Sequence, residues 1–426
     1  MRSRSCTVVI SALGLFTACG PTPENSNGNA NNTAADAQVI DGPRLTGVVN
    51  GPSQAFPVQG ALVAAFSSPP PAIPDHVYCE ACVDLPAAVP NTLSGDDGSF
   101  TLPVLPGATY YLTVQKGQFR RVRQLTVPLG DGPHLVDPEY TTLPSRSDPS
   151  LGDTIPSIAV ASGSYDAMET IFGKVGIGAV DENDAFRCDS AEGVFDVYAN
   201  GGHCQGPDFA ELLDDLSAML QYHIIFVPCS EASYALTDPS VRQNIRDYTW
   251  AGGKWYVADW SYDMVEQVWP EFLEFTAGSS ACDQTVLGDC NHGPSFDSDG
   301  HAVDDDLRSW LSAQGITDDD LILRENWDTI GSLGQGKVGE HPDTGDVYQP
   351  PHVWVEGPWR SGTSWRTGPN YPLTVSWPFN CGRVLFTSYH SVGEMGATHA
   401  GLYPQEKILF YLVMEIGVCS TGPIVR

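Results

Sequence analysis

The stretch GGKWYVADWSYDMVE, Gly252 to Glu266, decides the fold of the second half of the chain. The apolar run Trp255–Ala258 is typical of a strand that is buried on both faces of a parallel sheet. Asp259 and Trp260 stand where the chain must turn, and residues 261–268 carry a helical pattern. The stretch therefore predicts a strand, a sharp turn and a helix, which is the repeating unit of α/β sheets.

The same alternation continues on both sides of this stretch. Strands are predicted at residues 157–161, 194–198, 223–227 and 384–388, and helices at 164–175, from 208, from 238, and at 405–417. Alternating strands and helices predict a doubly wound α/β sheet. We expect this sheet to occupy residues 153–426, with an insertion at about 276–372 that is rich in Gly, Asp, Trp and Pro.

The order of these elements and the chemistry of the turn resemble the class I glutamine amidotransferase-like fold and its ThuA-like relatives, which have a flavodoxin-like sheet. In amidotransferases the turn reads GxCxG, and a later strand ends in a His that is followed two residues on by Glu. Here Asp259 stands at the cysteine position, His390 ends the later strand, and Glu394 lies four residues on. The resemblance implies a site at these residues. The missing cysteine argues against glutaminase activity, because the thiolate is the nucleophile of that family.

Further candidate residues follow the ends of neighbouring strands. Cys229 lies just beyond the apolar run 223–227, and sheets of this kind bind ligands at the carboxyl ends of their strands. We therefore expect Cys229 to share one sheet edge with Asp259, His390 and Glu394. The predicted binding residues beside them are Glu231, Trp260, Tyr262 and Tyr389.

Each of these candidates also has a plainer interpretation. Cys229 can be a small buried residue or an oxidised one, and Asp259 can cap the helix that follows it. His390 can be a hydrogen-bonded structural residue, and Trp260 can belong to the core. The clustering of the polar candidates at one predicted edge favours a ligand-binding pocket, whether or not the pocket is catalytic.

Residues 44–148 have an all-β pattern. Alternating segments such as Leu45–Val49 and Tyr110–Val114 are separated by turn signals at Gly95–Gly98 and Leu105–Gly107. The run GxV…PVxGAxV…DGxF…LPGxxYxLxV resembles the carboxypeptidase regulatory-like domain, which is a transthyretin/Ig-like β-sandwich. This resemblance implies a spacer or adhesion domain without catalytic residues of its own.

The first residues have the pattern of an export signal. Arg2 and Arg4 precede a short apolar run, and Phe16 to Gly20 resembles the lipobox of Gram-negative bacterial lipoproteins. We expect residues 1–18 to be removed and Cys19 to be lipidated; an ordinary secretory signal is the alternative. Residues 19–43 are small and polar and are predicted to be a flexible tether. The expected location is the cell envelope, anchored by lipid, with Gly20 favouring the outer membrane.

The formal net charge of −31 argues against a nucleic-acid partner, because phosphates would be repelled. We expect the membrane to be a partner through the N-terminal lipid, and the other partner to be an envelope protein or a glycan. We interpret the excess of Asp and Glu as an acidic surface that is exposed to solvent.

Nine cysteines remain when Cys6 leaves with the signal and Cys19 takes lipid, and in an oxidising compartment most should pair. Spacing predicts three local disulfides and one between the last strand and last helix. These pairs are Cys79–Cys82, Cys188–Cys204, Cys282–Cys290 and Cys381–Cys419, with Cys229 left over. The CxxC at Cys79 is also compatible with a metal site, although a disulfide is favoured.

Asp297, Asp299 and Asp304 surround Gly300 in a pattern that resembles a calcium-binding loop. The terminal bidentate Glu of such a loop is absent, and a solvated acidic loop is the favoured interpretation. We expect no other cofactor.

Two functions follow from these observations. The first is a non-catalytic, ligand-binding or scaffolding role for the amidotransferase-like domain of a lipid-anchored envelope protein. The alternative is an extracytoplasmic hydrolase, with glycans as a candidate substrate. In that case Asp259 or Cys229 is the nucleophile, His390 the acid or base, and Glu394 its orienting partner.

Overall fold

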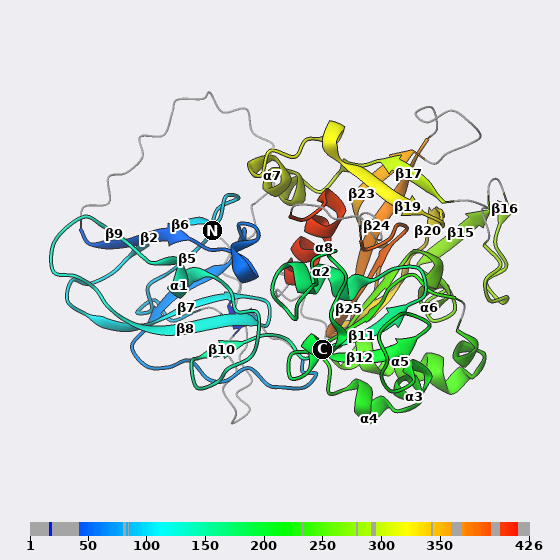
Figure 1. The fold of residues 1–426 in the computed structure, drawn as a ribbon, viewed down its shortest axis with the longest axis horizontal. Helices are drawn as coiled ribbons and strands as arrows, with labels where there is room; N and C mark the ends of the chain where they lie inside the picture. Colours follow the sequence, from blue (N-terminus) through cyan, green and yellow to red (C-terminus); the bar gives the residue numbers. More distant parts are fainter. Residues whose placement is uncertain are drawn as a thin grey trace.

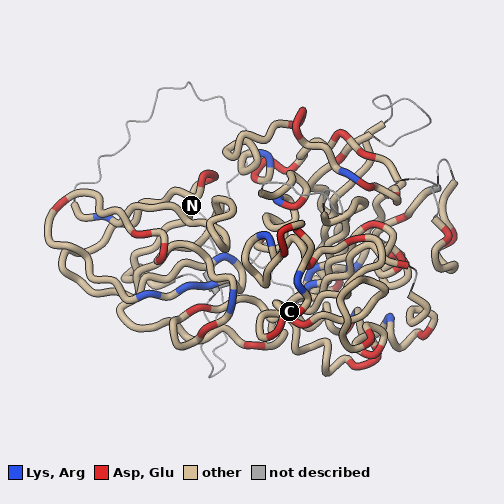
Figure 2. The backbone as a smooth tube through the Cα atoms, in the orientation of Figure 1, with Lys and Arg blue, Asp and Glu red and all other residues tan. Residues whose placement is uncertain are grey.

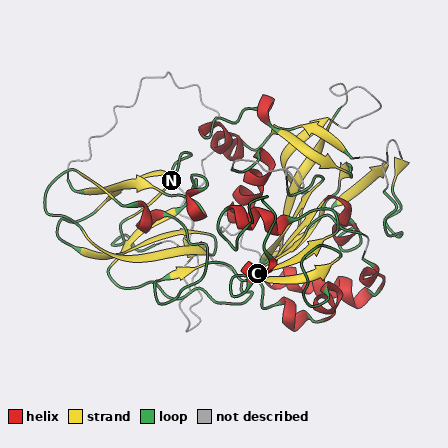
Figure 3. Ribbon diagram, viewed as in Figure 1, coloured by secondary structure: helices red, strands yellow, loops and turns green. Residues whose placement is uncertain are grey.

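The structure is a computed structural model that describes residues 42–79, 85–231, 233–277, 280–290, 295–341, 344–358, 369–392 and 401–415, and the backbone of 17–18 and 82–83. The protein is multidomain and rich in β-sheet, with N-terminal strands beside a larger α/β part (Figure 1). Helices gather almost entirely in the second part (Figure 3). Acidic residues are spread over both parts and outnumber basic ones (Figure 2).

The N-terminal part contains a five-stranded sheet of order β10-β8-β7-β3-β5 and a three-stranded sheet of order β6-β2-β9. The strands are β2 (Arg44–Val48), β3 (Leu62–Phe66), β5 (Asn91–Leu93), β6 (Ser99–Pro103), β7 (Thr109–Lys116), β8 (Phe119–Thr126), β9 (Pro133–Leu135) and β10 (Asp153–Thr154), and a short helix α1 (Pro138–Thr141) follows β9. Leu45 and Leu102 of one sheet and Val63 and Leu112 of the other are buried in the same core. Burial of apolar side chains from both sheets holds this part together.

Two local features fix the ends of these strands. The turn before β6 requires Gly98, whose φ is +77° and whose missing Cβ leaves room for the carbonyl of Val49. Asp153 pairs with Arg121 and Arg123, each at 2.9 Å. These ion pairs reinforce the antiparallel pairing of β10 with β8 at the edge of the five-stranded sheet.

The α/β part is built on an eight-stranded sheet of order β12-β11-β13-β14-β25-β24-β23-β18. Its strands are β11 (Ile158–Gly163), β12 (Asp196–Asn200), β13 (Ile224–Val227), β14 (Lys254–Ala258), β18 (His301–Ala302), β23 (His352–Pro358), β24 (Asn370–Phe379) and β25 (Gly382–Thr387). The first five strands in this order are parallel, and the last three are antiparallel. If these five parallel strands are numbered by their position in the chain, β11 is strand 1 and β25 is strand 5. Their order across the sheet is then 2-1-3-4-5.

Helices cover both faces of this sheet. They are α2 (Met168–Lys174), α3 (Phe209–Asp214), α4 (Leu216–Met219), α5 (Pro239–Ala251), α6 (Asp263–Glu266), α7 (Asp305–Ala313) and α8 (Pro404–Glu415). Along β14, Tyr256 packs in the cluster that includes α2 and α8, whereas Trp255 and Val257 pack in the cluster of α3 and α5. Successive strand residues point to opposite faces, and both faces are covered, which explains the continuous apolar run of β14.

The remaining strands lie mostly in the predicted insertion. They are β15 (Leu273–Ala277), β16 (Ser280–Ala281), β17 (Phe296–Asp299), β19 (Ile322–Asn326), β20 (Ile330–Leu333), β21 (Gly336–His341) and β22 (Gly345–Gln349), with β1 (Thr17–Ala18) and β4 (Cys82–Val83) near the N-terminus. The insertion also supplies β18 and β23, which extend the main sheet through β24. It is therefore part of the sheet and not a separate appendage.

Two predicted helices differ from those in the structure. The helix expected at 164–175 begins only at Met168, because Ala167 before it has non-helical backbone angles (φ −118°, ψ 66°). The helix expected from residue 208 is divided at Asp215, whose side chain accepts hydrogen bonds from the backbone of Ser217 and Ala218 at 2.9 and 3.1 Å. An Asp that caps a new helix ends the preceding one.

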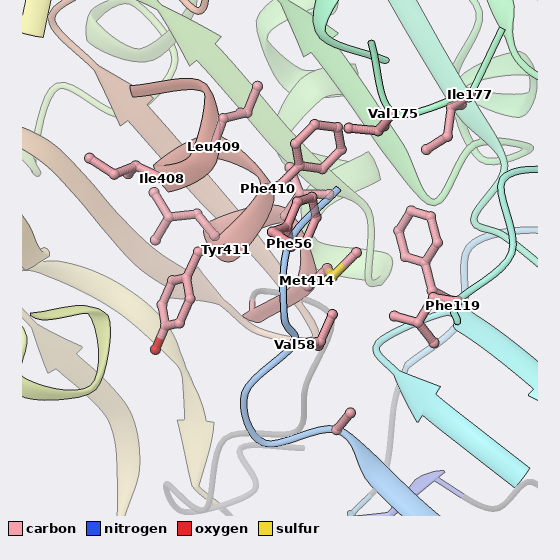
Figure 4. Packing of buried hydrophobic residues seen from close by; sticks show 14 of the residues in the cluster. Phe56, Val58, Phe119, Val175, Ile177, Ile408, Leu409, Phe410, Tyr411 and Met414 are labelled. Atoms are coloured by element: carbon pink, nitrogen blue, oxygen red, sulfur yellow. The ribbon is translucent and has the colours of Figure 1, made fainter. Parts of the chain in front are cut away.

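The two parts are joined by an aromatic contact between Phe56 and helix α8 (Figure 4). The Phe56 ring lies 5.3 Å from that of Phe410 and 6.1 Å from that of Trp310. Trp310 also donates its indole N–H to the carbonyl of Pro57 at 2.8 Å. The apolar residues of the N-terminal part and of α8 thus form one continuous core.

The disulfides confirm two predicted pairs and correct two others. Cys188–Cys204 and Cys282–Cys290 are present as predicted. Cys79 is bonded to Cys381, so the predicted pairs Cys79–Cys82 and Cys381–Cys419 are wrong. Among the described cysteines Cys229 is free, as predicted.

Cys79 reaches the α/β part because the segment before it runs along that part. The backbone N–H of Val77 donates to the carbonyl of Leu220 at 2.9 Å, and the Tyr78 ring lies 5.8 Å from that of His223. Ser157 Oγ donates to the carbonyl of Asp75 at 2.9 Å. Sequence spacing contains no information about these long-range contacts, so it favoured the nearest cysteine.

In the part of the chain that the structure describes, no helix combines the length and apolarity needed to cross a bilayer. Residues 1–16 of the predicted signal peptide, the lipidation residue Cys19, Glu394 and Cys419 lie outside the described residues.

Candidate functional site

The strand, turn and helix predicted around Asp259 are confirmed. Strand β14 ends at Ala258, the chain turns through a 3-10 helix at Asp259–Ser261, and α6 follows. Asp259 has a φ of +49°, a left-handed conformation that is uncommon for residues other than Gly. Ser261 holds the turn in place, because its hydroxyl donates to the carbonyl of Pro228 at 2.7 Å and accepts the backbone N–H of Ser230 at 3.1 Å.

Cys229, Asp259 and His390 meet at this edge of the sheet. The sulfur, a carboxylate oxygen and an imidazole nitrogen all lie within 4.8 Å of one another. Their side chains follow the carboxyl ends of the adjacent parallel strands β13, β14 and β25, which explains why they converge. The three residues are 1%, 0% and 4% exposed.

His390 Nε2 lies 3.2 Å from Asp259 Oδ2, which is ion-pair distance. The two atoms are not aligned as a hydrogen bond, and His390 Nδ1 also has no hydrogen-bond partner. Three polar atoms of the site are therefore buried and unsatisfied, a costly arrangement unless something else binds them.

The residues around the site hold its side chains in position. The backbone N–H of Trp327 donates to Asp259 Oδ1 at 2.8 Å. The carboxylate of Asp166 accepts the backbone N–H groups of Ser391 and Val392 at 2.6 and 3.1 Å, directly after His390. Gln405 of α8 donates its side-chain amide to the carbonyl of His390 at 2.7 Å.

Burial and nearby charges shift the pKa of each of the three groups. Burial raises the pKa of Asp259 to about 6, although the neighbouring His390 opposes this rise. Burial, and then the charges of Asp259 and Asp166, raise the pKa of the Cys229 thiol well above its ordinary value. Burial alone would lower the pKa of His390, but Asp259 and Asp166 raise it overall. Cys229 is consequently a protonated thiol at neutral pH and not an activated thiolate.

A second layer of buried acids lies behind the turn. Burial, followed by the charge of Asp263, raises the pKa of Glu266 to about 8. Burial raises the pKa of Asp263 to about 6, and burial followed by the charge of Asp259 raises that of Asp328 well above its ordinary value. Both carboxylate oxygens of Glu266 and of Asp328 lack hydrogen-bond partners. The loop that the Cys282–Cys290 disulfide closes contacts this layer, because the backbone N–H of Gly288 donates to Asp263 Oδ2 at 3.0 Å.

The predicted binding residues divide into two groups. Glu231 is exposed and accepts a hydrogen bond from the Tyr165 hydroxyl at 3.0 Å, and Trp260 is half-buried. Tyr262 and Tyr389, in contrast, are buried and pack in the hydrophobic core, and their predicted place in a pocket stays a prediction. The hydroxyl of Tyr262 accepts the backbone N–H of Cys290 at 2.9 Å, and that of Tyr389 lies 2.7 Å from the Thr374 hydroxyl.

The three calcium candidates have other structural roles. Asp297 and Asp299 lie on strand β17, and Asp297 accepts the backbone N–H of Glu325 at 3.3 Å. Asp304 caps helix α7 through the N–H of Leu307 and lies 3.0 Å from His352 Nε2. Among the described residues these acids do not form a cluster of metal ligands. Calcium binding by this segment stays a prediction.

Sequence reasoning missed two residues that support the site. Asp166 follows the end of β11, so the same strand-end argument that selected Cys229 would have found it. Trp327 lies in the predicted insertion, and no local pattern places its backbone beside Asp259. The indole of Trp327 lies 6.3 Å from that of Trp260, which puts two half-buried tryptophans next to the site.

Comparison with known proteins finds similarity only among solved structures. No family model matches the chain, and no curated protein matches it. A cytoplasmic protein from Salmonella typhimurium is 11% identical, with a TM-score of 0.34 over 61% of this chain and 98% of that one. A ThuA-like protein from Bacteroides uniformis is 11% identical, with a TM-score of 0.34 over 63% of this chain and 94% of that one. One from Parabacteroides merdae is 12% identical, with a TM-score of 0.32 over 62% and 88%. At these TM-scores the similarity carries no argument about function.

Proposed function

We propose that this chain is a lipid-anchored protein of the bacterial cell envelope whose α/β part binds a ligand at the sheet edge. In this proposal residues 1–18 are a signal peptide, Cys19 carries the lipid at the outer membrane, and residues 19–43 are the tether. Residues 44–148 form a carboxypeptidase regulatory-like sandwich that serves as a spacer. Residues 153–426 form an amidotransferase-like or ThuA-like domain of flavodoxin-like architecture, which the 2-1-3-4-5 order of its parallel strands supports.

The state of the two potential nucleophiles supports binding over cysteine-type hydrolysis. Asp259 is fully buried, and its oxygens face the backbone N–H of Trp327 and the ring of His390. Burial and two carboxylates keep the Cys229 thiol protonated. Asp259 is not exposed, and the Cys229 thiol is neither exposed nor ionised at neutral pH, whereas the amidotransferase mechanism requires an accessible thiolate.

The aromatic residues beside the site favour a glycan as the ligand. Trp260 and Trp327 are half-buried next to Asp259, and Tyr165 is 40% exposed at the same edge. Partly exposed aromatic rings offer an apolar face with a polar rim, which suits the mixed surface of a sugar. Glu231, which bonds the Tyr165 hydroxyl, supplies an acceptor for sugar hydroxyls.

Titration of the full chain with soluble envelope glycans, followed by tryptophan fluorescence, tests this proposal. We expect saturable binding that Trp260→Ala weakens by roughly tenfold or more. Tyr348→Ala, which removes a 53% exposed aromatic residue on β22, is the matched control and should bind like the wild type. Equal binding by Trp260→Ala and the wild type, or no saturable binding, contradicts the proposal.

A hydrolase is the second candidate, because Asp259 has a positive φ at the turn and lies beside His390 and Cys229. Turnover would be measured on amide, ester and glycoside substrates. If the protein binds its ligand without catalysis, we expect no turnover above the rate measured without protein. Turnover that His390→Ala abolishes in a correctly folded variant would establish the hydrolase instead.

A further inference from the structure

Three different donor atoms converge in one buried volume at the edge of the sheet. They are the sulfur of Cys229, a carboxylate oxygen of Asp259 and a nitrogen of His390, all within 4.8 Å of one another. From this convergence we propose that Cys229, Asp259 and His390 bind a divalent transition metal, with zinc as the ion that suits them best. The inference concerns metal binding alone and does not depend on whether the site catalyses a reaction.

The donor types select the class of metal. Zinc accepts thiolate, imidazole and carboxylate ligands, whereas calcium and magnesium require oxygen donors. Three protein ligands leave the fourth tetrahedral position for water or for a group of a bound ligand. One thiolate and one carboxylate match the charge of a divalent ion, because the imidazole binds as a neutral ligand.

The distances agree with a tetrahedral site. Nitrogen and oxygen donors that bind one zinc ion lie roughly 3.3 Å apart, and His390 Nε2 and Asp259 Oδ2 are 3.2 Å apart. Nitrogen and sulfur donors would lie roughly 3.6 Å apart, so the sulfur, which is within 4.8 Å of the nitrogen, needs to approach it by at most about 1.2 Å, which a side-chain rotation provides. Asp259 Oδ2 and His390 Nε2 both lack hydrogen-bond partners, as expected of two atoms that face a shared ion.

Hydrogen bonds from neighbouring residues help to position the three proposed ligands. The backbone N–H of Trp327 donates a hydrogen bond to Asp259 Oδ1 at 2.8 Å, which leaves Oδ2 for the metal. Asp166 fixes the backbone just after His390, and Ser261 links the Cys229 loop to the turn. Such outer contacts orient ligands in metal sites. When the metal binds, Cys229 releases its thiol proton to solvent and the sulfur forms the bond to the metal.

Cobalt substitution of the full chain tests this proposal. After treatment with a chelator, the protein with its three described disulfides intact is titrated with Co²⁺ and then Zn²⁺ while absorption is recorded. We expect one equivalent of Co²⁺ to give a thiolate-to-cobalt charge-transfer band and intense tetrahedral bands, and Zn²⁺ to displace it. Cys229→Ser should lose the charge-transfer band and weaken Zn²⁺ binding by at least roughly 100-fold, the upper end of what loss of an outer partner of a ligand costs.

His203→Ala is the matched control, because His203 lies 3.4 Å from the sulfur of Cys204, which is locked in a disulfide. This variant should bind Co²⁺ like the wild type. If Cys229→Ser does not fold, Asp259→Asn is the second variant and should weaken Zn²⁺ binding by at least roughly tenfold. The proposal is overturned if the wild type binds no stoichiometric metal, if the charge-transfer band persists in Cys229→Ser, or if Asp259→Asn binds unchanged.

Discussion

Cys79 of the N-terminal part is disulfide-bonded to Cys381 of the α/β part, across a sequence separation of 302 residues. Cys381 lies in the turn between β24 and β25, two strands of the main sheet. The bond therefore covalently fixes the N-terminal part to the sheet that carries the candidate site.

Non-reducing peptide mapping should recover a peptide with Cys79 linked to one with Cys381. Cleavage after Glu80 separates Cys79 from Cys82, so the two possible pairs have different masses. A peptide with Cys79 linked to Cys82 would contradict the structure. Replacing both Cys79 and Cys381 with Ser should lower the free energy of unfolding by about 3 kcal/mol, because the unfolded chain regains conformational freedom. Urea denaturation under non-reducing conditions measures this loss.

Cys229 should react slowly with iodoacetamide in the native protein. The thiol is 1% exposed, and its pKa is raised by burial and by neighbouring carboxylates, so both access and ionisation are limiting. We expect alkylation at neutral pH to be at least roughly 100-fold slower than in denaturant, as measured by mass spectrometry. Fast alkylation of the native thiol would indicate an activated nucleophile and would favour the hydrolase.

Glu266 should make the protein less stable as the pH rises from its ordinary pKa of 4.5 to about 8. In this window the unfolded chain has released the proton while the folded state retains it, so the free energy of unfolding falls with pH. Glu266→Gln carries no such proton and should be more stable than the wild type at pH 8, by on the order of 3 kcal/mol.

At pH 4 the Glu266→Gln variant and the wild type should have nearly the same stability, because both are neutral at this position. Thermal denaturation at pH 4, 6 and 8 measures the difference. The exposed Glu192→Gln is the matched control and should follow the wild-type curve. A constant difference between Glu266→Gln and the wild type at all three pH values would rule out a buried, protonated Glu266.

Phe56 should be required for the two parts to pack together. Its ring is 3% exposed and lies 5.3 Å from that of Phe410 on α8. Phe56→Ala should lower the free energy of unfolding by about 3 kcal/mol, because it removes buried apolar area and leaves a cavity. Leu135→Ala removes a side chain that is 83% exposed and should cost less than about 0.5 kcal/mol. Similar denaturant midpoints for these two variants would show that the aromatic contact contributes little.

The parallel strands were predictable because their apolar runs are continuous and each is followed by a helix signal. Strands β11, β13, β14 and β25 lie within a few residues of their predicted positions. The same local argument placed Cys229, Asp259 and His390 at one edge, since the carboxyl ends of adjacent parallel strands meet there. The Cys188–Cys204 and Cys282–Cys290 disulfides join cysteines that are close in the sequence, so their spacing was enough to predict them.

The amino-acid sequence by itself determined the strand–turn–helix unit around Asp259 and the convergence of strand ends at the site, because both depend on residues near one another in the chain. Only the tertiary structure decided that Cys79 bonds Cys381, that Tyr262 and Tyr389 face the core, and that Trp327 and Asp166 support the site. These outcomes depend on which segments pack together across long sequence distances. Such packing depends on many weak contacts between distant segments, and no local pattern of residues predicts it.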